Sequence, residues 1–173
     1  GWKSVAGPFT VTEVDRNVVK TLDWRPAIDV YREVVEEHSG KKLTAENFFD
    51  LAKFFPFGIN KLGSERIIRD PLFLTEEGHL VCVGELMVDS LVDIMNGVPE
   101  NLIKSANTAL ELAKTDFPGS VEGRPRLLID CISRTLCLED RFGEELNSMN
   151  EPDQPLIGAL TIGEIANSGK DYL

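Results

Sequence analysis

Two apolar segments of strand length in the last third of the chain constrain its fold most strongly. Residues 127–134 read LLIDCISR, and residues 155–165 read PLIGALTIGEI. Continuous apolar runs of this length, without alternation, are typical of strands that are covered on both faces. Each run ends in small and charged residues. We therefore predict two core strands that carry polar groups to the rim of a sheet.

The rest of the chain combines strand-like and helix-like segments. Residues 9–12 and 18–22 flank the turn sequence DRN and predict a β-hairpin. Apolar residues at helical spacing predict a helix that ends at Gly40 and another that starts at Pro99. The expected order is β-β-α-α-β-β-β-α-β-α-β, in which strand–helix–strand units of the second half allow parallel pairing. We predict an α+β fold: a mixed, largely antiparallel β-sheet with helices packed on it.

The net charge and the length of the apolar runs argue against nucleic acid and membrane as partners. Among 173 residues, 29 Asp and Glu outweigh 18 Lys and Arg, which gives a formal net charge of −11 at pH 7. Such a surface repels phosphate backbones and anionic lipid, so we expect no nucleic-acid partner. No apolar run approaches the roughly 20 residues that span a bilayer, so we expect no membrane insertion. Three cysteines without a CxxC pair indicate a reducing, cytoplasmic setting.

Metal and nucleophilic chemistry are poorly supported. His38 and His79 are the two histidines, far apart in the sequence, and no HExxH or paired Cys/His spacing occurs. Cys131 lies between Ile129 and Ile132, which indicates a packed thiol rather than a reactive thiolate. We therefore expect no cofactor, no metal site and no enzymatic activity.

Polar groups at the ends of the two core segments are the best candidates for binding. Asp130 and Arg134 are four residues apart, hence on one side of a strand that continues so far. They form either a salt bridge that neutralises a buried aspartate or a clamp for a ligand that carries both charges. Thr161 and Glu164 end the second segment beside Gly163, and a glycine in a core strand often marks close approach by another segment or a ligand.

Several motifs in order resemble the C-terminal domain of the FIST family. They are FPFG at residues 55–58, IRDPL at 68–72, EEG at 76–78, IDCISR at 129–134, the acidic pair at 144–145, PLIG at 155–158 and TIGEI at 161–165. The resemblance covers about residues 27–173, within a domain that we expect over residues 24–173. Residues 1–23 resemble the tail of a preceding FIST N-terminal domain, or form a leading hairpin. The chain departs from the family signature at Ser133, where the family has glycine, and at Ala159, Leu160 and Ile162, where it has aromatic residues.

The resemblance implies a cytoplasmic sensory domain of a signal-transduction protein. Domains of this family are thought to bind small ligands, with amino acids proposed, and occur beside signalling partners such as histidine kinases or other output domains. On this reading Arg69 and Arg134 bind a ligand carboxylate, Asp130 or Glu164 binds an ammonium group, and Thr161 lies at the pocket rim.

Other functions remain open from the sequence. The same residues are purely structural if the chain is a protein-interaction scaffold with no small ligand. Some relatives have been described as haem-based nitric oxide sensors, and a hydrolase that uses Cys131 is a further alternative.

Overall fold

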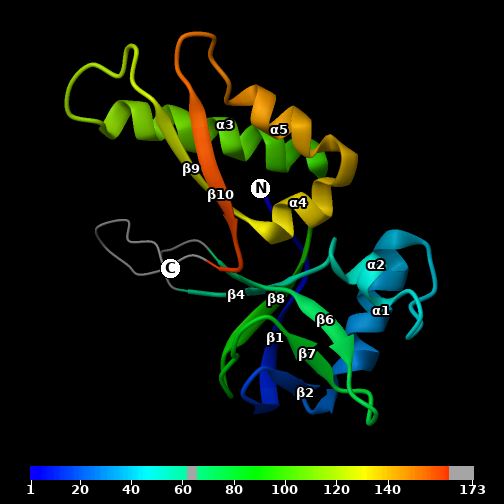
Figure 1. Ribbon diagram of the computed structural model, residues 1–173. Coiled ribbons are helices and arrows are strands. Elements are labelled where there is room, and N and C mark those ends of the chain that lie inside the picture. The colour runs from blue at the N-terminus through cyan, green and yellow to red at the C-terminus, as the bar shows by residue number, and fades with distance from the viewer. Residues whose placement is uncertain (62–65, 164–173) are drawn as a thin grey trace. The chain divides into compact units, whose positions relative to one another are not determined.

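The structure is a computed structural model that describes residues 1–61 and 66–163 (Figure 1). The chain divides into two compact units, one of residues 3–96 and one of residues 97–173 together with Gly1–Trp2. Each unit contains both helices and strands. The predicted α+β class is confirmed.

An antiparallel sheet of eight strands forms the unit of residues 3–96. Its hydrogen-bonded order is β5-β4-β8-β1-β2-β7-β6, with β3 paired to β2. Figure 1 shows these strands curving around a common interior. Their bounds are β1 Lys3–Asp15, β2 Val18–Leu22, β3 Arg25–Pro26, β4 Phe57–Ile59, β5 Ile67–Arg69, β6 Pro71–Leu74, β7 Leu80–Cys82 and β8 Leu91–Asn96.

The core of this unit draws on the sheet, on helix α1 (Ala27–Ser39) and on the short helix α2 (Phe48–Ala52). Tyr31 of α1 is fully buried, and its ring centroid lies 5.5 Å from that of Phe57. Its hydroxyl donates to the carbonyl of Phe55 at 2.7 Å, so the buried phenol keeps a hydrogen bond. As predicted, α1 stops at Gly40, whose left-handed φ of 67° lets its N–H return to the carbonyl of Glu36.

Residues 1–23 supply the predicted hairpin. They form β1 and β2, which are neighbours within the eight-stranded sheet. Their assignment to the tail of a preceding domain stays a prediction.

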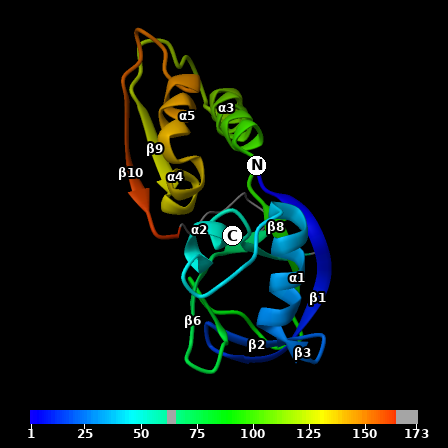
Figure 2. The same ribbon diagram turned by 90° about the vertical axis from the view of Figure 1, so that its right-hand side faces the viewer.

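The second unit consists of helices packed on a parallel strand pair. Strands β9 and β10 pair residue for residue, from Arg126 opposite Leu156 to Cys131 opposite Thr161. The predicted parallel pairing in the second half of the chain is thereby confirmed. Figure 2 shows α3 and α5 on the same side of the two strands. The elements are α3 Pro99–Asp116, β9 Arg126–Cys131, α4 Ile132–Leu138, a 3₁₀ turn Glu139–Arg141, α5 Phe142–Ser148 and β10 Leu156–Thr161.

The two strands are less buried than the sequence predicts. Leu127 and Ile129 of β9 are 74% and 50% exposed, and Ile157 of β10 is 59% exposed. These side chains share one face, because alternate strand residues point to opposite sides and Leu127 pairs with Ile157. The helices of this unit lie on the other side (Figure 2). The prediction that both strands are covered on both faces is therefore wrong for the described residues.

Candidate functional site

A pocket of about 500 Å3 lies between α3 and β9 in the second unit. Helix α3 lines it with a row of small side chains, Ser105, Ala106, Ala109 and Ala113. Residues three and four positions apart share a helix face, so this row follows the length of the helix. Because the side chains are short, space remains between helix and strand. The volume falls within the range of small-molecule pockets, about 300–1,000 Å3.

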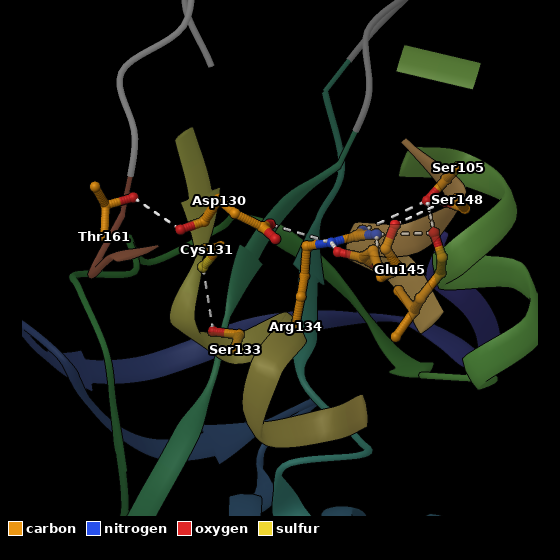
Figure 3. Close-up of polar contacts among 9 residues, drawn as sticks. Ser105, Asp130, Cys131, Ser133, Arg134, Glu145, Ser148 and Thr161 are labelled. Atoms are coloured by element: carbon orange, nitrogen blue, oxygen red, sulfur yellow. Dashed lines mark hydrogen bonds and ion pairs between the residues drawn. The ribbon is translucent and has the colours of Figure 1, made fainter. Parts of the chain in front are cut away.

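At one end of the pocket, Arg134 of α4 and Glu145 of α5 form a two-point ion pair (Figure 3). Nε of Arg134 lies 3.1 Å from Oε1 of Glu145, and Nη2 lies 2.5 Å from Oε2. Glu145 is fully buried. Nη2 of Arg134 also donates to the carbonyl of Leu102 at 2.8 Å, and Nη1 lies 3.4 Å from the hydroxyl of Ser105. Each of the three guanidinium nitrogens of Arg134 therefore already contacts a protein group.

Asp130 contacts the same nitrogen of Arg134 as Glu145 does (Figure 3). Its Oδ1 is 3.3 Å from Nε of Arg134. Its Oδ2 is buried and has no hydrogen-bond partner among residues 1–61 and 66–163. Only 6% of the residue is exposed, and a buried carboxylate oxygen without a donor is costly. We call Asp130, Arg134 and Glu145 the acidic end of the pocket, because two carboxylates share one arginine there.

The environment of Asp130 changes its ionisation. Burial raises the pKa of the Asp130 carboxyl to about 6, and the charge and hydrogen bonding of Glu145 act in the same direction. Arg134 and the backbone N–H of Cys131 oppose this rise in pKa without cancelling it. The carboxyl thus changes charge near neutral pH.

The opposite end of the pocket is formed by Lys114, Arg124 and Arg126. Lys114 is ion-paired with Glu111 and Glu151, and Arg126 lies 3.9 Å from Glu151, so the three cations exceed the two carboxylates by one positive charge. Arg126 donates to the carbonyls of Met149 and Gln154, and its Nε is buried without a hydrogen-bond partner in the described part of the chain. The guanidinium of Arg124 lies 5.3 Å from the ring centroid of Phe117. We call these three residues the basic end.

The predicted pairing of Asp130 with Arg134 occurs, but not on a strand. Strand β9 ends at Cys131, and Arg134 lies in the first turn of α4. The two side chains still meet, because residues four apart are also neighbours where a helix starts. The sequence placed both on one side only on the condition that the strand continued to Arg134, and this condition is not met.

The sequence predicts three further binding residues, Thr161, Arg69 and Glu164. The hydroxyl of Thr161 donates to the backbone carbonyl of Asp130 at 3.2 Å, so it ties β10 to β9. Arg69 belongs to the unit of residues 3–96, where it donates to the carbonyls of Glu85 and Ile68. Glu164 lies outside the described residues.

The sequence indicates Glu145 only as part of the acidic pair at 144–145 and not as a binding residue, and it indicates none of the basic-end residues. Glu145 falls on the face of α5 that also carries the apolar residues Phe142, Leu146 and Met149. The position of a charged residue within an apolar stripe of a helix was the signal that could have revealed Glu145, since such a residue is rarely buried without a partner.

The described residues contain neither a cluster of metal ligands nor a helix that could span a membrane. No group of three or more His, Cys, Asp or Glu side chains is placed to hold a metal ion within residues 1–61 and 66–163. In the same part of the chain, every helix is too short or too polar to cross a membrane. The Sγ atom of Cys131 lies 3.4 Å from the hydroxyl of Ser133.

The fold and the pocket define an α+β protein with a pocket that is acidic at one end and basic at the other. The family model of the FIST C domain matches residues 27–167, well over half of the chain, so the chain belongs to the FIST C domain family. The resemblance indicated by the sequence motifs is confirmed. Membership implies a sensory module of signal transduction. No curated protein and no solved structure gives a significant match to the chain.

Proposed function

We propose that this chain is a small-ligand-sensing module and that Asp130 binds an ammonium group of the ligand. The observation that carries the proposal is Oδ2 of Asp130, a buried carboxylate oxygen with no donor in the described residues, at the end of a 500 Å3 pocket. A ligand ammonium supplies both the missing donor and the positive charge that two carboxylates and one arginine lack.

A carboxylate ligand fits the acidic end less well. The nitrogens of Arg134 already contact Glu145, Asp130, Ser105 and Leu102. Binding a ligand carboxylate there would displace buried Glu145, at a cost typical of breaking a buried ion pair. The geometry therefore favours the ammonium group of an amino compound over a carboxylate at this position.

We also propose that the chain acts by binding rather than by catalysis, in the cytoplasm, and passes its state to an output partner such as a histidine kinase. Family membership supports the signalling role. Cys131 is partly buried and its Sγ atom contacts the hydroxyl of Ser133, which does not act as a base at neutral pH; this contact supports binding rather than nucleophilic catalysis.

The test is a thermal-shift titration of the full chain at pH 8 with n-butylamine and, as the uncharged control, n-butanol. A ligand at 100 times its dissociation constant stabilises by about 2.7 kcal/mol. We expect the amine to raise the melting temperature, the alcohol to leave it unchanged, and Asp130→Asn to remove the shift. Asp153→Asn, an exposed position in the same unit, is the matched control. Equal effects of amine and alcohol, or an intact shift in Asp130→Asn, would contradict the proposal.

A protein-interaction scaffold is the second candidate. Leu127, Ile129 and Ile157 form an exposed apolar face of the strand pair, and such patches often bind other proteins. This candidate predicts that Leu127→Ser with Ile157→Ser abolishes capture of a partner from native lysate, whereas Asp130→Asn leaves it intact.

A further inference from the structure

We infer that the ligand of this pocket is a short peptide that lies extended along the free edge of β9, with its amino terminus at Asp130. The inference rests on the proposed function, since it identifies the compound whose ammonium group Asp130 binds. Three features of the pocket carry it: an unpaired strand edge, a matching length, and opposite charges at its two ends.

The edge of β9 that faces the pocket has unpaired backbone groups. The N–H of Arg126 donates to the carbonyl of Pro155, on the β10 side. Backbone groups alternate in direction along a strand, so those of Leu127 and Ile129 point away from β10. Within the described residues, no backbone hydrogen bond from outside the β9–β10 pair reaches the N–H or C=O of either residue.

The pocket lining shows that this edge is accessible from the pocket. Every residue from 125 to 130 contributes to the lining. Side chains of a strand alternate between its faces, so an uninterrupted series of lining residues indicates contact along the edge rather than on one face. Extended peptides bind such edges by adding a strand.

The two charged ends are separated by the length of a tripeptide. Arg126 and Asp130 are four residues apart on β9, which is about 13 Å at 3.3 Å per residue. Ser105 and Lys114 bound the same distance on α3, about 13 Å at 1.5 Å per residue. A tripeptide extends about 10 Å, which leaves each terminus within reach of the side chains at its end. A single amino acid is too short to contact both ends.

The charges set the direction of the peptide. Its ammonium group meets Asp130 at the acidic end, and its carboxylate meets the exposed guanidinium of Arg124 at the basic end. Since β9 runs from Arg126 towards Asp130, the peptide lies antiparallel to it. The alanine row of α3 favours small or apolar peptide side chains on that side. A polyamine offers no negative end and matches only half of the pocket.

Isothermal titration calorimetry of the full chain at pH 8 with tri-alanine tests the inference on the ligand side. We expect N-acetylation to weaken binding by about tenfold or more, because the ammonium group is lost. A C-terminal amide and N-methylation of the central peptide bond are each expected to cost about fivefold, through loss of the carboxylate and of one edge hydrogen bond.

Arg124→Gln gives the matching test on the protein side. Arg124 is exposed, so its replacement leaves the buried pairs intact. The variant is expected to weaken tri-alanine by about fivefold and the tri-alanine amide hardly at all, because the amide no longer uses the arginine.

The outcomes separate this inference from the proposed function. If n-butylamine or alaninamide binds at Asp130 but tri-alanine binds no more tightly, the peptide inference is overturned and the proposed function stands. If tri-alanine binds but central N-methylation has no effect, pairing along the β9 edge is overturned. If no amine binds, both fail.

Discussion

Arg134 and Glu145 form two parallel N–H···O contacts of 3.1 and 2.5 Å between α4 and α5, with Glu145 fully buried. This pair determines what the pocket can bind. Because Glu145 makes the two-point contact with the guanidinium, Asp130 is left with a 3.3 Å contact from Oδ1 to Nε of the same arginine, and its Oδ2 has no hydrogen-bond partner in the described residues. The acidic end is therefore one positive charge short, and a ligand ammonium group completes it.

Loss of Arg134 should destabilise the chain strongly. Arg134→Ala leaves Glu145 buried and unpaired, which typically costs about 3–5 kcal/mol. Replacing all three charged residues, as Arg134→Met with Glu145→Leu and Asp130→Asn, should recover most of that loss, because no buried charge is left alone. Urea denaturation gives the free energies of unfolding. The control is Arg141→Ala, which breaks exposed pairs with Glu100 and Glu144 and should cost less than about 1 kcal/mol. Equal costs for Arg134→Ala and Arg141→Ala would contradict this view of the pair.

Stability should depend on pH through Asp130. Its folded-state pKa of about 6 exceeds the ordinary value of 3.8, so the folded chain holds this proton to higher pH than the unfolded chain. The contribution is fully present below pH 3.8 and is lost as the pH rises through about 6. The groups that face Asp130 are Arg134 from α4 and Glu145 from α5.

The Asp130→Asn variant isolates this pH effect, because the neutral amide does not titrate. Carboxyls with a lowered pKa, such as those of Glu100 and Glu151, have the opposite effect: their contribution to the stability of the chain is lost as the pH falls. We therefore expect the stability of Asp130→Asn relative to the unmodified chain to rise between about pH 4 and 7, by on the order of 1–3 kcal/mol. A difference that stays constant over this range would show that the Asp130 pKa is not raised.

Gly158 should be indispensable for the strand pair. A Cβ atom at this position would lie 2.0 Å from the carbonyl oxygen of Leu128, which belongs to the backbone of β9 and cannot move aside freely. Gly158→Ala is therefore expected to cost about 2 kcal/mol or more. Gly143→Ala is the control, because nothing lies within 4 Å of a Cβ there and helix α5 favours alanine. Thermal denaturation of both variants compares them, and equal stability would contradict the close approach of the strands.

The three cysteines should react with iodoacetamide as ordinary or protected thiols. Burial raises the pKa of the Cys82 thiol to about 12, and Cys137 is buried. Cys131 is partly exposed and should be alkylated slowly at pH 7.5, while the other two react only after denaturation. Mass spectrometry of timed samples measures this. Rapid labelling of Cys131 in the native chain would instead favour the hydrolase alternative.

Local sequence signals predicted the elements that carry their own start, stop or turn residues. Pro99 marks the start of α3, Gly40 the end of α1, and the residues DRN the turn between β1 and β2. The strand–helix–strand order of the last third also predicted the parallel pairing of β9 and β10.

The site needed tertiary information. The apolar run through Ile132 did not reveal that the strand ends at Cys131, because α4 begins without a side-chain cap. The exposure of Leu127 also could not be predicted, because the exposed face of β9 is itself apolar and the strand therefore shows no alternation. The burial of Glu145 depends on Arg134 reaching across from another helix. The basic end depends on the packing of Arg126 against the end of α5.

The central claim is that Asp130 binds an ammonium group, and its carboxyl pKa tests this most directly. Carbon-13 NMR of Asp130 across pH 3–9, with and without saturating n-butylamine, measures the pKa in each state. The account predicts a pKa near 6 in the free chain and a fall towards the ordinary aspartate value with the amine, because the bound cation favours the carboxylate. An unchanged pKa in the presence of bound amine would contradict it.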